Sequence, residues 1–180
     1  MRRFTIPAAV CGLAFAGPAM AADPVVTASV PQGIVSLLEI AGYEPRLGTD
    51  SYDDPSIHLE LGGWAADIAF YGCADETHDG CTELQLIGGF DTNFSVSAET
   101  ALGIARQSRF AQVYMDDEGD VWVEWDIVTG KGIPQGVFLK GLRNFTDALQ
   151  FAGGVVFPED QAQTSAEAAV DAVEQAAQGE

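Results

Sequence analysis

Residues 110–128 read FAQVYMDDEGDVWVEWDIV, and this stretch predicts two β-strands joined by a tight turn. Side chains alternate along its second half with the period of a strand that buries one face. One face holds Val121, Val123, Trp125 and Ile127, and the other holds Trp122, Glu124 and Asp126. Gly119 falls where a short hairpin loop needs a residue in the left-handed conformation. The stretch therefore predicts an antiparallel hairpin with one face on a hydrophobic core.

The region before this hairpin predicts further strands. Apolar residues alternate with polar ones over 57–61, 64–70 and 84–86, and the tight turn Gly62-Gly63 separates the first two runs. Residues 44–50 predict a short additional strand ahead of the Asp-rich turn that ends at Asp54-Pro55. Because strands joined by short turns pair antiparallel, these runs and the hairpin belong to one antiparallel sheet.

Apolar residues at helical spacing predict three helices. The first follows Ser29, which we expect to act as its N-cap. The second follows Ser97, another residue type that caps helices well. The third starts at Pro134 and runs to Leu149, and beyond Gly153-Gly154 we expect only an irregular apolar end.

The predicted element order is α-β-β-β(-β)-α-β-β-α. It indicates an α+β fold in which three helices pack on one face of an antiparallel sheet of five to six strands. Charged residues at the alternate strand positions would share the opposite, wetter face with one tryptophan. This candidate binding face consists of Glu60, Asp67, Trp122, Glu124 and Asp126.

The N-terminus predicts an export signal. A short basic region containing Arg2-Arg3 precedes an apolar run over 4–16, and Ala19-Met20-Ala21 is a small-x-small cleavage site. We therefore expect a signal peptide at 1–21, a single domain at 22–157, and an acidic Ala- and Gln-rich tail at 158–180 that is helical or disordered. The expected location is periplasmic or secreted.

The chain is strongly acidic, with 27 Asp and Glu against 8 Lys and Arg and a formal net charge of −19. This balance opposes binding to nucleic acid and to anionic membrane surfaces, both of which need clustered cations. No run approaches the roughly 20 apolar residues of a membrane-spanning helix. The partner we expect is another polypeptide, including a second copy of this chain.

Cys73 and Cys81 bracket a polar loop between two predicted strands, and in an oxidising compartment they predict a disulfide bond. The third cysteine, Cys11, lies inside the predicted signal peptide. The alternative is a zinc site that adds Asp75 and His78 to the two cysteines. This spacing lacks the usual Cys-x2-Cys pattern, so the disulfide is favoured.

Acidic loops raise a second metal hypothesis. Asp116, Glu118 and Asp120 stand at the first, third and fifth positions of a calcium-binding loop of the EF-hand type. Such a loop also needs Gly at position six and Glu at position twelve, where this chain has Val121 and Ile127. A solvated hairpin tip explains these acids better, and they remain weak metal candidates.

Motifs of catalysis are lacking in the sequence. It contains no Gly-x-Ser-x-Gly elbow, no His-Glu-x-x-His and no glycine-rich phosphate loop, and it has only two histidines. Carboxylate pairs are poor evidence for hydrolysis in so acidic a chain. We expect no enzyme activity, no catalytic residues and no cofactor.

From Gly33 to about Leu149 the sequence resembles the YbjN family, described as bacterial sensory transduction regulators. The stretches that carry the resemblance are Ala41-Gly42-Tyr43, the Asp50 turn before Asp54-Pro55, FYGC at 70–73 with Cys81, RQSRF at 106–110, YMDDEGD at 114–120 and EWD at 124–126. Residues 102–105 depart from the family's Asn and Trp pattern, which marks a divergent member.

The resemblance implies a fold similar to that of type III secretion chaperones, with helices on a twisted antiparallel sheet, often dimeric. It implies no enzyme activity. Two functions of different class follow: a non-enzymatic, chaperone-like or regulatory protein-binding module of the cell envelope, or an extracytoplasmic calcium-binding domain or hydrolase with a carboxylate-based site.

Overall fold

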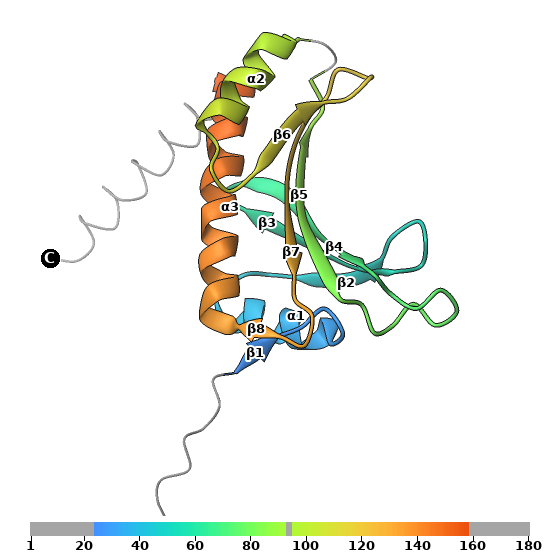
Figure 1. Cartoon of the computed structure of the whole chain (residues 1–180). Helices are drawn as coiled ribbons and strands as arrows, with labels where there is room; N and C mark the ends of the chain where they lie inside the picture. Colours follow the sequence, from blue (N-terminus) through green and yellow to red (C-terminus); the bar gives the residue numbers. More distant parts are fainter. Residues whose placement is uncertain (1–23, 93–94, 159–180) are drawn as a thin grey trace, which may run out of the picture.

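The computed structural model of the chain describes residues 24–92 and 95–158. The predicted signal peptide and nearly all of the predicted acidic tail lie outside these residues. The described part forms two layers, with helix α3 lying along one face of a large curved sheet (Figure 1).

Six antiparallel strands make up the large sheet, in the spatial order β2-β3-β4-β5-β7-β6. The strands are β2 (Arg46–Thr49), β3 (Pro55–Leu61), β4 (Trp64–Tyr71), β5 (Glu83–Phe90), β6 (Gln112–Met115) and β7 (Val121–Val128). The α+β fold and the predicted hairpin are confirmed, and Gly119 has a φ of 83° at the β6–β7 turn. Strands β2 and β6 are the two edges of this large sheet.

The three helices are α1 (Pro31–Ile40), α2 (Ala98–Gln107) and α3 (Gln135–Val156). Helix α3 packs closely on the inner face of the sheet, with Leu149 against Gly88 of β5 and Trp64 of β4 against Gly153. The packing leaves no room for a side chain at either glycine, because an added Cβ atom would lie 2.3 Å from Leu149 at Gly88 and 2.3 Å from Trp64 at Gly153. Helix α2 lies against the edge strand β6, and α1 lies near β2 (Figure 1). Within the described residues no helix is both long and apolar enough to cross a membrane.

Two helix ends differ from the sequence predictions. Ser97 caps α2 as predicted, because its side chain accepts a hydrogen bond from the Thr100 amide. The predicted cap at Ser29 is wrong: Val30 occupies the N-cap position of α1 without a side-chain hydrogen bond, and the Ser29 hydroxyl pairs with Thr27 instead. Helix α3 continues through the two glycines at 153 and 154 to Val156.

A two-stranded sheet, which the sequence did not predict, joins the N-terminal segment to the residues just before α3. Strand β1 (Val25–Val26) pairs antiparallel with β8 (Ile133–Pro134). The Gln135 amide also donates to the Pro24 carbonyl, and the Ala28 amide donates to the Thr129 hydroxyl. These contacts fasten the N-terminal segment to the start of α3.

The core lies between the inner face of the large sheet and the three helices, with α3 contributing most of the helical side chains. Its largest fully buried side chains include Phe70, Phe138, Phe145 and Leu142. The outer face, on the side away from α3, is much wetter and presents the alternate residues of every strand (Figure 1). This division positions the candidate site.

Candidate functional site

The predicted acidic face is a single continuous surface in the structure, the outer face of the six-stranded sheet. One row of cross-strand neighbours traverses all six strands: Arg46, His58, Asp67, Ile87, Glu124 and Gln112. Glu60 and Trp122 lie on the same side, because each is two residues from a member of this row. All five residues of the predicted binding face therefore share one side of the sheet.

Part of this face is hollowed into a concavity of about 850 Å³. Its floor includes Ala65 and Gly89, which lie on neighbouring strands, each two residues from the Asp67–Ile87 pair. The small side chain of Ala65 leaves space above β4. The Trp122 ring leans over β5, since a Cβ on Gly89 would meet it at 2.7 Å.

Acidic groups dominate the lining of the concavity. Five carboxylate residues line it, against two basic ones. The carboxylate residues are Glu44, Glu60, Asp67, Asp91 and Asp120, and the basic ones are Arg46 and His58. His58 Nδ1 makes a close contact with an Asp67 carboxylate oxygen. The aromatic residues Tyr43 and Trp122 complete the walls, so the hollow combines negative charge with aromatic surface.

Beside the hollow, a polar network covers the outer side of β5, β6 and β7. Gln85 donates to Glu124 and to Asp126, and the Tyr114 hydroxyl donates to Glu124 at 2.7 Å. Burial and then the hydrogen bond to Glu124 raise the pKa of Tyr114 to about 12. Burial, with the nearby Glu124 and Asp126 charges, also raises the pKa of Tyr71. Both shifts come first from burial, and the neighbouring carboxylates on this face add to them.

The weak metal candidates at the β6–β7 turn do come together. One ligand atom from each of Asp116, Glu118 and Asp120 lies within 4.8 Å of the others. The Asp116 carboxylate, however, already accepts hydrogen bonds from the Glu118 and Asp120 amides and from the Trp122 indole N–H at 2.8 Å. The indole hydrogen bond and then the amides lower the pKa of Asp116. Its observed role is to shape the turn and to hold Trp122.

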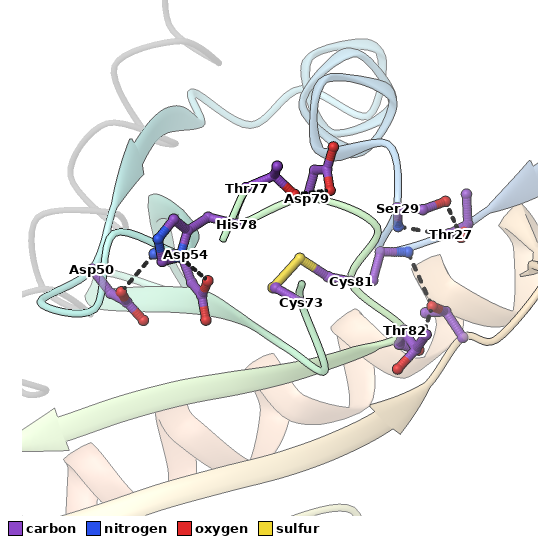
Figure 2. The surroundings of a disulfide bond; sticks show 12 residues. Thr27, Ser29, Asp50, Asp54, Cys73, Thr77, His78, Asp79, Cys81 and Thr82 are labelled. Carbon is purple, nitrogen blue, oxygen red and sulfur yellow. Dashed lines mark hydrogen bonds and ion pairs between the residues drawn. A yellow bond between two sulfur atoms is a disulfide. The ribbon is translucent and has the colours of Figure 1, made fainter. Parts of the chain in front are cut away.

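Cys73 and Cys81 form a disulfide at the base of the β4–β5 loop (Figure 2). Cys81 is buried at 1% exposure and belongs to the core. The loop is further fixed where the Thr129 hydroxyl and the Thr129 and Gly130 amides donate to the Thr82 carbonyl. The two sulfur atoms are thus bonded to each other, which removes them from the zinc-site alternative.

His78 has a role that the sequence analysis missed. Its Nδ1 atom lies 2.9 Å from an Asp54 carboxylate oxygen (Figure 2). This contact joins the disulfide loop to the β2–β3 turn, whose own shape depends on Asp50 accepting the Tyr52 and Asp54 amides. No spacing in the sequence indicates the pair, because 24 residues separate its members.

These features define a small α+β protein whose antiparallel sheet is covered by a long helix on one face and presents a hollowed acidic face on the other. The family model of YbjN, "Putative bacterial sensory transduction regulator", matches residues 31–151, and the chain belongs to this family. The resemblance inferred from the sequence is confirmed.

One solved structure extends the comparison of the fold. It is an uncharacterized protein from Methanothermobacter thermautotrophicus, with a TM-score of 0.51 and 13% identity. The match covers 71% of this chain and 96% of that chain. At this identity the likeness concerns the fold alone. No curated protein matches the chain.

Proposed function

We propose that the protein is a non-enzymatic binding module, exported through a cleaved signal peptide at 1–21, that grips another polypeptide on the outer face of its sheet. Its place of action would be the cell envelope, where it would serve a chaperone-like or regulatory role. Residues 22–157 would act as one domain, and 158–180 as an acidic tail. The family's regulatory description supports a role in protein interaction.

The observation that carries this proposal is the hollowed outer face. Its side chains are held in place by hydrogen bonds across strands, as Glu124 is by Gln85 and Tyr114. A rigid, sterically open surface of this kind loses little conformational freedom when it binds. The groups gathered on it are hydrogen-bonding carboxylates and aromatic rings, which suit the recognition of a protein chain.

Site-specific photocrosslinking in intact cells tests the proposal. A photoreactive amino acid at Glu60, on the outer face, should give a discrete crosslinked polypeptide that mass spectrometry identifies. The same amino acid at Lys140, exposed on α3 across the sheet, should not give that species. A crosslink to the chain itself would identify a homodimer. Equal labelling from both positions, or none from Glu60, would contradict the assignment of this face.

Export is tested separately. Osmotic-shock fractionation should release a protein whose intact mass corresponds to a start at Ala22 with Cys73 and Cys81 oxidised. A cytoplasmic protein that retains Met1 would refute the envelope location while leaving the binding face to be judged on the crosslinking result.

A calcium-binding function is the second candidate, favoured by the approach of Asp116, Glu118 and Asp120 to one another. The hydrogen bonds that already engage Asp116 weigh against it. We therefore rank calcium binding below protein binding.

A further inference from the structure

We propose that the outer-face hollow binds an extended polypeptide segment that carries Arg or Lys side chains, one of which stacks on Trp122. This inference rests on the proposed protein-binding function and deepens it by naming the chemistry of the partner. Charge, the fixed position of Trp122 and the shape of the floor support it in turn.

Charge complementarity is the first argument. Five carboxylate residues line the hollow, and one of its two basic residues, His58, already contacts Asp67. Glu124 and Asp126 add negative charge beside it on the same sheet face. A cationic segment would offset this repulsion among carboxylates, whereas an acidic or neutral one would not. A second copy of the chain would bring the same carboxylates to the face, so self-association through it is disfavoured.

Trp122 supplies the second argument, because it is held ready before any ligand arrives. Its indole N–H donates to Asp116, and its six-membered ring lies over Gly89. Guanidinium and ammonium groups bind the faces of indole rings, especially when carboxylates stand nearby. Asp120 and Asp91 line the same hollow as Trp122 and provide those carboxylates.

The floor of the hollow gives the third argument. Ala65 projects little from the sheet, so a chain can approach the strands closely between Glu60 on β3 and the Trp122 ring, which lies over Gly89. In an extended segment, alternate side chains point to the same side. Two basic side chains at alternate positions could therefore reach the Glu60 side and the Trp122 side of the hollow together.

Fluorescence anisotropy with a labelled peptide tests this inference. The probe is an eight-residue peptide in which Arg alternates with Ser, and the matched control peptide has Gln in place of every Arg. The full-length exported protein should bind the Arg peptide, and raising the salt from about 0.05 M to 0.15 M should weaken binding. The Gln peptide should not bind at the same protein concentration.

Variants locate the binding site. Glu60→Gln with Asp91→Asn should weaken binding by about three- to tenfold, because two lining charges are lost. Asp75→Asn with Glu76→Gln removes the same charge from the exposed disulfide loop and should change affinity by less than about twofold. Trp122→Leu should weaken binding by about five- to thirtyfold. Thermal unfolding by circular dichroism would verify that each variant folds.

The outcomes separate this inference from the proposed function. Equal weakening by both double variants would mean that overall charge attracts the peptide, and the assignment to the hollow would be overturned. An Arg peptide that fails to bind, together with a specific crosslink from Glu60, would leave the proposed function standing and remove the cationic partner. Loss of both signals would remove both proposals. Should Trp122→Leu fail to fold, Trp122→Phe gives the same test with a smaller expected loss.

Discussion

Two acid-rich loops stand at opposite ends of strand β5, and the structure fixes them by different means. The β4–β5 loop is closed by the Cys73–Cys81 disulfide and tied to a neighbouring turn by His78 and Asp54. The β6–β7 turn depends on the single carboxylate of Asp116, which accepts two amides and an indole. Two loops of similar acidic composition are therefore held differently: a disulfide bond closes the β4–β5 loop, and hydrogen bonds to one carboxylate shape the β6–β7 turn.

Removing the disulfide should have the largest effect of the changes that probe this comparison. Cys73→Ala with Cys81→Ala frees the β4–β5 loop in the unfolded chain and should lower the free energy of unfolding by about 2–3 kcal/mol. Urea denaturation measures the change. A reducing agent should shift the wild-type midpoint in the same direction and leave the variant unaffected. A wild-type protein indifferent to reduction would show that the bond does not stabilise the loop.

Replacing Asp116 should have a smaller effect that depends on pH. The folded-state pKa of Asp116 lies below its ordinary value of 3.8, so the carboxylate stabilises the fold above that value. This stabilisation is lost as the pH falls through the lowered folded pKa. The Asp116→Asn variant should therefore unfold at a lower urea concentration than wild type at pH 7. The difference between the two urea midpoints should become smaller below pH 3.8.

A neighbouring carboxylate provides the control for these urea unfolding measurements at different pH values. Asp117→Asn removes the exposed carboxylate that follows Asp116 in the chain, and its urea midpoint should stay close to that of wild type at every pH. If the urea midpoints of Asp116→Asn and wild type differ by the same amount at every pH, the turn does not depend on the charged form of Asp116.

Breaking the His78–Asp54 pair should matter less, because both side chains are partly exposed. His78→Gln should lower the free energy of unfolding by about 0–1 kcal/mol. Hydrogen exchange is the sharper measurement, since amides of the β2–β3 turn should exchange faster once the neighbouring loop no longer holds Asp54. Asp54→Asn should reproduce this local change, and unaltered exchange in both variants would show that the two loops are independent.

Calcium should have the smallest effect of all. The Asp116 carboxylate is already hydrogen-bonded, so we expect no shift in the thermal unfolding midpoint when millimolar calcium is added to the purified protein. A clear upward shift that disappears in Glu118→Gln would instead establish a calcium site at the β6–β7 turn.

Local features of the fold could be predicted from the sequence, because each depends on a few neighbouring residues. Alternation along 121–128 gave β7, Ser97 gave the start of α2, and Gly119 gave the turn. Features that depend on distant partners were missed. Helix α3 continues past Gly153 while Trp64 fills the space that a side chain there would need, and the sequence near Gly153 contains no sign of this.

The candidate site divides in the same way. Alternation correctly placed Glu60, Asp67, Trp122, Glu124 and Asp126 on one face, because strand period alone decides which side a residue takes. The hollow was not predicted, since it arises from the register that sets Gly89 beside Trp122 and from small residues on adjacent strands. Register between strands is a property of the assembled sheet.

The pairing of β1 with β8 has a consequence for the order of events during synthesis. The Ala28 amide meets the Thr129 hydroxyl 101 residues further along the chain, so this corner of the protein cannot close until most of the domain has been made. The N-terminal segment is thus among the last parts to be secured. A nascent chain would therefore keep residues 25–28 unpaired until residues 129–134 have been made.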